Sequence, residues 1–291
     1  MAGPGRVPPA AARLPRLPGV YRFRDRHGRP LYLGRAVDLR RRVSSYWGDL
    51  GDRGHLAGMV RNVHRVEAVV CDSGHEAAWL ERNLLERELL PANRTPGGQE
   101  VPVYVCVRGA PGRWRLTVDH VPPDARRSVC FGPYLGGARV RTAVRALRQA
   151  HPDPELARVR GVEPADPGAP AAVLRRDPSA VAAFRATLLR RRDAAVDRLA
   201  FEVAARLQAE LDAVDWVVAE QRATVRDPVD LDAYGWADGV LVRLGIRAGR
   251  MCEWDQTPCT HAAAAARLSV TPPPWRPFAD RTADLAARLA R

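Results

Sequence analysis

Lysine is absent from this chain of 291 residues. Its 46 basic residues other than histidine are therefore all arginines, and against 33 acidic residues they give a net charge of +13. Arginine is effectively never deprotonated in proteins. The arginines of this protein can hold an anion, but none of them can lose a proton and act as a base.

Long hydrophobic runs are also absent. No stretch approaches the roughly 20 apolar residues that a membrane-spanning helix needs. Residues 1–18 lack the apolar core of a signal peptide. The sequence therefore predicts a cytoplasmic protein with no membrane partner.

Cysteine is scarce, with five residues spread over distant segments. An odd number at such spacing argues against a disulfide framework. We expect buried thiols in strand-like surroundings at Cys71, Cys106 and Cys130. Because there is no second close pair, we do not expect a zinc site at Cys252, Cys259 and His261.

Positive charge is concentrated near the N-terminus, where residues 14–47 hold nine arginines against two aspartates. Such a cluster can grip a polyanion. An arginine-rich composition of the whole chain is the plainer explanation of the charge. The length suggests about two domains.

Tyr21 and Tyr32 lie in two short segments that are joined by a stretch with alternating residues. The pattern predicts a β-hairpin whose turn is His27 and Gly28. Residue 26 then faces 29, residue 23 faces 32, and residue 21 faces 34. Since side chains alternate along a strand, both phenols project from one face. Either tyrosine alone would be interpreted as an ordinary half-buried strand residue.

A helix is predicted from Asp38, its N-cap, to about Trp47. Arg42 and Tyr46 are four residues apart on its inward side. Arg40 and Arg41 lie on the outward side. We expect them to contact solvent or a DNA backbone.

A second helix is predicted from His75 to about Leu90. Glu81 lies within its apolar stripe, where burial of an unpaired carboxylate is costly. A cation or a metal ion should therefore meet this carboxylate. Glu88 shares much of the same face and is the competing candidate, with a salt bridge as its ordinary explanation.

Together these segments resemble the GIY-YIG nuclease domain, in the version that opens the UvrC-type excinuclease subunit of bacterial nucleotide excision repair. The order and the spacing of the motifs both agree with that domain. The resemblance covers residues 12–97, and its matching elements are residues 14–21, 31–34, 39–46, 76–81 and 91–93.

The resemblance implies a phosphodiesterase that uses one divalent ion, Mg²⁺ or Mn²⁺. Glu81 would be the protein ligand of this ion, with water and phosphate in the other positions. Tyr21 or Tyr32 would orient or deprotonate the attacking water. Arg42 would hold the scissile phosphate, and the site would be completed by Tyr46 and Asn93.

Two positions depart from the family. Arg35 stands where a lysine normally follows the glycine of the second motif, so this residue can be a phosphate clamp but not a general base. The family usually carries a cysteine cluster just after the segment that corresponds to residues 131–151, and this chain has none there. We therefore expect no iron–sulfur or zinc site at that point.

The remainder of the chain divides by composition. Residues 98–160 resemble the UvrC continuation, with strands expected near 101–107 and 114–118 and a helix near 138–150. Residues 161–178 have the composition of a linker. A helical pair is predicted within residues 179–224, and a β-rich segment with one short final helix within residues 225–291.

The helical segment resembles the UVR motif, the hairpin by which UvrC-type subunits grip UvrB. The usual Arg-Asp that ends the motif is replaced by Gln208-Ala209. An ordinary hairpin packed on its own domain is the alternative. The resemblance implies a UvrB-like partner, with UvrA in the same system, and contacts through Leu199, Phe201, Glu202 and Leu207.

The expected fold class is α+β: a short antiparallel sheet flanked by helices, then a helical hairpin and a small β-rich tail. The RNase H-like and helix-hairpin-helix domains of full-length family members are not expected. The expected activity is one metal-dependent incision in double-stranded DNA, 3′ to a lesion. The alternatives are a non-catalytic module that recruits repair partners, and a nuclease of a mobile-element, restriction or self-resistance system.

Overall fold

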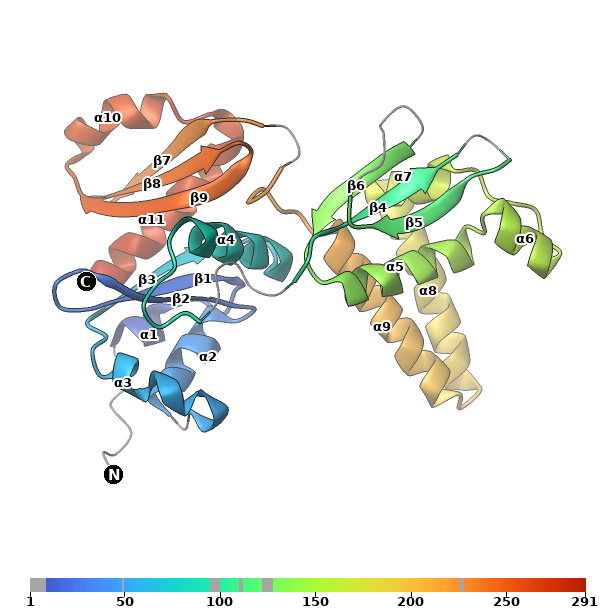
Figure 1. Ribbon diagram of the computed structural model, residues 1–291, viewed down its shortest axis with the longest axis horizontal. Coiled ribbons are helices and arrows are strands. Elements are labelled where there is room, and N and C mark those ends of the chain that lie inside the picture. Colours follow the sequence, from blue (N-terminus) through green and yellow to red (C-terminus); the bar gives the residue numbers. More distant parts are fainter. Residues whose placement is uncertain (1–8, 49, 95–99, 110–111, 122–127, 226–227) are drawn as a thin grey trace. The chain divides into compact units, whose positions relative to one another are not determined.

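The computed structural model describes residues 9–48, 50–94, 100–109, 112–121, 128–225 and 228–291. The chain divides into two compact units (Figure 1). The first unit joins residues 1–99 to residues 220–291, and the second consists of residues 100–219. The predicted C-terminal segment is therefore part of the same unit as the predicted nuclease domain.

The first unit contains a sheet with the strand order β2-β1-β3, in which both pairings are antiparallel. Its strands are β1 (Gly19–Arg24), β2 (Pro30–Ala36) and β3 (Arg65–Val70). As predicted, Phe23 faces Tyr32 and Tyr21 faces Gly34.

The predicted two-residue turn of this hairpin is wrong. The backbone N–H of Asp25 donates to the carbonyl of Arg29 at 3.0 Å, which leaves Arg26 to Gly28 in the loop. The Asp25 carboxylate accepts from the backbone N–H groups of His27 and Arg29 at 2.8 and 2.9 Å, and Gly28 has a φ of 78°. An aspartate that satisfies the loop backbone favours this longer turn.

Short helices and 3₁₀ turns cover one face of the β2-β1-β3 sheet. They are α1 (Pro9–Arg13), α2 (Leu39–Ser44), the turns Ser45–Trp47 and Gly51–Leu56, and α3 (Ala57–Val60). The Asp38 carboxylate accepts from the backbone N–H of Arg41 at 2.8 Å, as an N-cap does. Helix α4 (Gly74–Arg87) starts in the same way at Ser73 and contacts β1 and β2.

The C-terminal residues add a second sheet to this unit, with the order β7-β8-β9. Its strands are β7 (Leu231–Ala237), β8 (Val240–Arg247) and β9 (Arg250–Pro258), and α10 (His261–Ser269), a 3₁₀ turn (Pro273–Trp275) and α11 (Arg276–Ala290) follow. Helix α11 packs on β3, β7 and β8 (Figure 1). Its Leu285 and Leu289 join the core around Tyr21 and Phe23.

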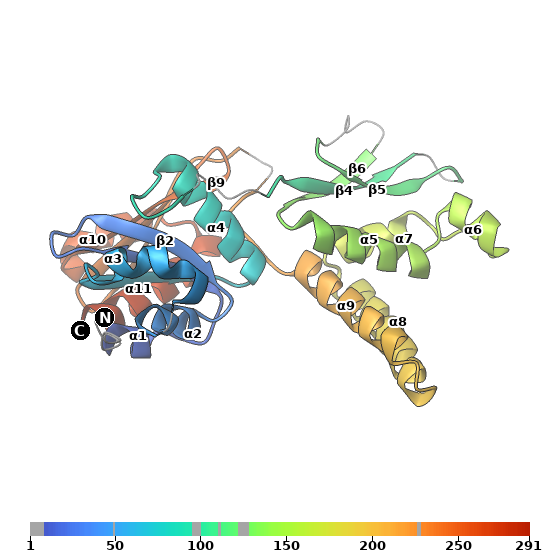
Figure 2. The ribbon, with the colours of Figure 1, turned by 60° about the horizontal axis from the view of Figure 1, so that its bottom comes forward.

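The second unit is a sheet with the order β5-β4-β6, covered by helices. The strands are β4 (Val103–Arg108), β5 (Arg115–Asp119) and β6 (Ser128–Tyr134). The helices are α5 (Gly137–Ala150), α6 (Pro154–Arg160), α7 (Gly168–Leu174), α8 (Pro178–Asp197) and α9 (Phe201–Val218). Figure 2 shows α8 and α9 side by side as the predicted helical pair.

The segment predicted as a linker, residues 161–178, instead contains α7. Ala171, Val173 and Leu174 of this helix are buried in the core of the second unit. The composition is that of a linker, but tertiary burial decides the structure. Helix α10 was likewise not expected.

A disulfide joins Cys106 to Cys130, which corrects the expectation of two buried thiols. The two residues face each other on β4 and β6. This register brings together cysteines that are 24 residues apart, and their spacing in the sequence does not reveal it. Cys71 is a buried thiol as expected. No helix in the described ranges is long and apolar enough to span a bilayer.

Candidate active site

Three phenols meet on the covered face of the β2-β1-β3 sheet. The Oη atoms of Tyr21 and Tyr46 are 2.7 Å apart, within hydrogen-bond distance. The ring centroid of Tyr32 lies 6.2 Å from that of Tyr21 and 5.9 Å from that of Tyr46. Tyr21 and Tyr46 are buried, whereas Tyr32 is half-buried. The predicted gathering of these side chains is thus present.

Tyr21 and Tyr32 hold their protons tightly. Burial, followed by the neighbouring phenols, raises the pKa of Tyr21 well above its usual value. The pKa of Tyr32 is also raised, first by burial, then by Tyr46, and further by the negative charge of Glu81. The positive charge of Arg42 has the opposite effect and lowers the pKa of Tyr32, but it does not outweigh the other causes. Near neutral pH, both tyrosines are therefore neutral hydrogen-bonding groups.

Gly34 leaves the space that the Tyr21 hydroxyl occupies. A Cβ atom at this position would lie 2.5 Å from Tyr21 Oη and 2.8 Å from the Tyr32 ring. Contacts this short are not tolerated without a shift of the neighbours. The glycine of the second motif is therefore a packing requirement of the tyrosine cluster.

Arg42 reaches this cluster from α2, as its helical spacing predicts. Its Nε donates to Tyr21 Oη at 3.4 Å, and its guanidinium carbon lies 5.6 Å from the centroid of the Tyr46 ring. Arg40 and Arg41 are exposed, as expected. Arg40 also donates from Nε to the carbonyl of Leu14 at 2.6 Å, which ties this side chain to the N-terminal segment.

Asn93 lies at the outer edge of β2. Its Oδ1 accepts from the backbone N–H of Leu33 at 3.0 Å, and its Nδ2 donates to the Leu33 carbonyl at 2.8 Å. The next carbonyl along this edge, that of Leu31, accepts from the backbone N–H of Ala92 at 3.0 Å. Asn93 therefore pairs the backbone of an edge strand. This contact positions β2, a role that the sequence motif did not indicate.

Glu81 of α4 contacts the same edge of β2, at Arg35. Its Oε1 accepts from the backbone N–H of Arg35 at 3.1 Å, and its Oε2 lies 3.2 Å from Nε of the Arg35 side chain. The Glu81 side chain is 22% exposed, so it lies at the rim and not inside the apolar stripe. The cation expected beside this carboxylate is Arg35.

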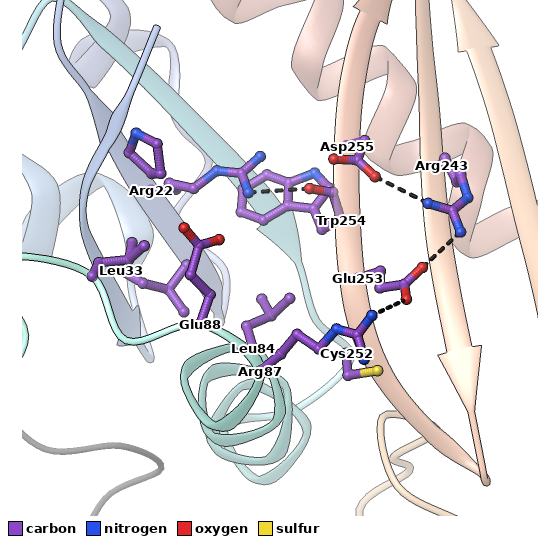
Figure 3. A pocket seen from close by; sticks show the side chains of 12 residues that line it. Arg22, Leu33, Leu84, Arg87, Glu88, Arg243, Cys252, Glu253, Trp254 and Asp255 are labelled. Carbon is purple, nitrogen blue, oxygen red and sulfur yellow. Dashed lines mark hydrogen bonds and ion pairs between the residues drawn. The ribbon is translucent and has the colours of Figure 1, made fainter.

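Glu88, the competing carboxylate, lines a different cavity. This cavity of about 210 Å³ lies between α4, the first sheet and β9, and the three tyrosines do not line it (Figure 3). Figure 3 shows Glu88 with Leu33, Leu84 and Arg22 around this space. Glu81 is therefore the carboxylate that accompanies the tyrosine cluster.

In the described parts of the chain, no three histidine, cysteine or acidic side chains gather as a metal-binding cluster. Glu81 offers a single carboxylate at the protein surface. Mg²⁺ commonly binds through one or two carboxylates and completes its shell with water and phosphate oxygens. The donor set thus fits an ion that is shared with a phosphate substrate.

Comparisons with known proteins identify the same segment. A family model described as the UvrC-like GIY-YIG domain matches residues 17–91. UvrABC system protein C of Haloarcula marismortui is 38% identical over 145 residues, which cover 48% of this chain and 24% of that protein.

Bacterial relatives give the same result. UvrABC system protein C of Brucella abortus biovar 1 is 31% identical over 153 residues, covering 52% of this chain and 24% of that protein. The protein of that name from Neisseria meningitidis serogroup A is 32% identical over 143 residues, covering 49% and 23%. The chain thus spans about a quarter of the length of these relatives. Residues 17–91 are a UvrC-like GIY-YIG domain, in a chain that is homologous to UvrABC system protein C over about half of its own length.

Proposed function

We propose that this protein is a metal-dependent DNA endonuclease that makes one incision in damaged double-stranded DNA, 3′ to the lesion, in nucleotide excision repair. The observation that carries the proposal is the meeting of three phenols and Arg42 on one face of the first sheet, with Glu81 near enough to act on the pKa of Tyr32. Homology to UvrABC system protein C supports the repair context.

The roles follow from position. Arg42 would hold the scissile phosphate, and Arg35 would clamp a neighbouring one. Tyr32 is half-buried, whereas Tyr21 and Tyr46 are buried. The phenolate form of Tyr32 would orient the water and accept its proton as the water oxygen bonds to phosphorus and the bond from phosphorus to the leaving deoxyribose oxygen breaks. Tyr21 and Tyr46 would hold Tyr32 and Arg42 in place, and Asn93 would fix the strand that carries Tyr32.

Glu81 would hold one Mg²⁺ or Mn²⁺ ion. When bound, such an ion neutralises developing negative charge and lowers the pKa of a coordinated water. The Arg35 side chain would exchange Glu81 for a substrate phosphate. Neutralising Glu81 also removes a charge that raises the pKa of Tyr32.

The partners in this proposal are DNA and a UvrB-like protein, with UvrA in the same pathway. Arg40 and Arg41 are exposed next to the site and suit a phosphate backbone. At the turn between α8 and α9, Leu199, Phe201 and Glu202 are exposed. Leu207 is only 3% exposed, so it would support the hairpin and not contact a partner.

The substitution Glu81→Gln tests the catalytic assignment. It keeps the volume of the side chain and removes the charge that would hold the ion. Single-turnover nicking with Mg²⁺ or Mn²⁺ should collapse across the pH range, while DNA binding survives.

Glu88→Gln is the matched control, because it makes the same chemical change at the C-cap of the same helix, where the side chain lines the other cavity. We expect it to nick at nearly the wild-type rate. If Glu81→Gln cuts as fast as the wild type, the metal assignment is wrong. Nicking rates on lesion-bearing and undamaged duplex, each measured with and without UvrA and UvrB, distinguish a repair nuclease from a nuclease of the other systems.

A further inference from the structure

Helix α4, which carries Glu81, is enclosed on both sides. It contacts β1 and β2 of the first sheet and also β9 of the C-terminal sheet. Its buried residues include Glu76 and Asn83, which are 0% and 1% exposed. Burying such polar groups is costly unless their hydrogen bonds are made inside the protein. Their partners therefore show what the helix is fitted against.

Asn83 has all of its hydrogen-bonding capacity occupied by the C-terminal residues. Its Nδ2 donates to the carbonyl of Ala223 at 2.8 Å and lies 2.9 Å from Oγ1 of Thr224. Its Oδ1 accepts from Nε and Nη2 of Arg250 at 3.1 and 2.9 Å. A primary amide has two donor hydrogens and two acceptor lone pairs, so nothing is left over.

Two further contacts hold the ends of the helix to the same part of the chain. In the first turn, Oε1 of Glu76 accepts from the backbone N–H of Arg222 at 2.7 Å. In the last turn, Arg87 points toward Glu253 on β9 and donates to its carboxylate at 3.2 Å (Figure 3).

These contacts lie along one line of the helix. Positions 76, 83 and 87 are separated by seven and four residues, which at 3.6 residues per turn places them on one face. Glu81 is five residues after Glu76 and two before Asn83, so its side chain leaves from another face, toward Arg35 of β2. Fixing the face of Asn83 therefore fixes the rotation of the helix and the direction of Glu81.

We propose that Asn83 is a positioning residue for Glu81, through which residues 223, 224 and 250 set the place of the metal-holding carboxylate. This inference rests on the proposed function, because it assumes that Glu81 holds the divalent ion. The C-terminal segment is then part of the nuclease machinery in the first unit, although it lies over a hundred residues away in sequence.

The test uses the full chain and two variants. Asn83→Asp keeps the shape but loses the two amide hydrogens, and Thr224→Val removes one contact from outside α4. Substitution of a residue that holds a metal ligand in place without touching the metal typically lowers metal affinity by about 10- to 100-fold. Because Asn83 acts through the helix, we expect the Mn²⁺ concentration for half-maximal nicking to rise about tenfold in Asn83→Asp, and less in Thr224→Val.

Two readouts distinguish positioning from loss of structure. A variant that is only less stable has fewer active molecules, which lowers the maximal rate and leaves the Mn²⁺ midpoint unchanged. A displaced carboxylate moves the midpoint, and it also weakens Mn²⁺ binding measured directly from the electron paramagnetic resonance signal of the free ion. The control is Asn62→Asp, the same change at an exposed asparagine whose side chain donates to the Gly58 carbonyl.

The proposal is overturned if both Asn83→Asp and Thr224→Val melt at the wild-type temperature and keep the wild-type Mn²⁺ midpoint and Mn²⁺ binding. If Asn83→Asp does not fold, Thr224→Val decides by the same criteria. Should Glu81→Gln bind Mn²⁺ as well as the wild type does, the metal assignment falls, and this inference falls with it.

Discussion

Tyr21 and Tyr32 place the same phenol in two different surroundings. Tyr21 is fully buried and lies within hydrogen-bond distance of Tyr46 and Arg42, so its hydroxyl is committed to the protein. Tyr32 is half-buried, and the charge of Glu81 acts on it. Sequence left the choice of the base open between the two, and these surroundings favour Tyr32.

The pH dependence of nicking follows from this assignment. Because the pKa of Tyr32 is raised, its reactive anion is a small fraction at neutral pH and grows as the pH rises toward that pKa. Single-turnover nicking should therefore rise from about pH 6 to 9, with a log-rate slope near one where the base limits the rate.

Tyr32→Phe should lower the rate by about a hundredfold to ten-thousandfold and flatten the slope. Tyr21→Phe is the comparison, since it removes one hydroxyl from the same cluster and should keep the slope. A flat pH profile in Tyr21→Phe with a wild-type slope in Tyr32→Phe would reverse the two roles.

Local spacing was sufficient to place some of these residues and not others. Arg42 and Tyr46 could be predicted because an interval of four residues on a helix fixes a shared face. The α-helix ends at Ser44 and not near Trp47 as expected, but the 3₁₀ turn Ser45–Trp47 follows it directly and keeps Tyr46 beside Arg42. The partner of Asn93 could not be predicted in this way, since it is the backbone of Leu33, 60 residues away. The ion pair between Glu81 and Arg35 similarly depends on how α4 meets the edge of β2.

Among the elements, the α8–α9 hairpin offers the clearest docking feature for the proposed UvrB-like partner. Leu199 and Phe201 are 73% and 63% exposed at its turn. Phe201→Ala should weaken binding to UvrB in calorimetry and leave the circular dichroism spectrum unchanged, because an exposed ring adds little to folding.

Val159→Ala provides the control for this experiment, since Val159 is 79% exposed on α6 of the same unit. It should bind UvrB as the wild type does. Absence of binding by the wild-type protein would end the idea of a UVR-like contact.

Elements with strong local signals were predictable. The strands expected near 101–107 and 114–118 correspond to β4 and β5, and the helices expected at 75–90 and 138–150 correspond to α4 and α5. Helix α7 was missed because its sequence is rich in alanine, glycine and proline, and its helical state depends on burial against the core of the second unit. The disulfide was missed for a related reason, because only the pairing of β4 with β6 brings its cysteines together.

At the scale of the whole molecule, the first unit is assembled from two distant parts of the chain. Leu285 and Leu289 of α11 complete a core that includes Tyr21 and Phe23. The β-rich nature of the C-terminal segment was predictable from its alternating pattern, but its attachment to the unit that holds the β2-β1-β3 sheet was not. Hydrophobic patterns report which face is buried and not what buries it.

The net charge predicts the salt dependence of DNA binding. The arginines near the site offer charge but few groups that read bases, so affinity should be mainly electrostatic. Each phosphate contact should add about 0.9 to the slope of log affinity against log salt concentration. Arg41→Gln should lower this slope by about that amount.

Arg158→Gln removes an exposed arginine from the second unit and should leave the slope unchanged. The measurement is equilibrium binding to a duplex over a series of salt concentrations. Affinity that barely changes with salt would contradict the electrostatic account.

The divided first unit also sets an order of events during synthesis. Asn83 leaves the ribosome well before Arg250, its partner on β9. At roughly 5 to 20 residues per second, the intervening chain takes about 10 to 30 seconds to make. Until then α4 lacks its C-terminal support. In the proposed nuclease, a nascent chain would therefore carry the tyrosine cluster before Glu81 is held in place, and cutting would begin only after Arg250 has left the ribosome.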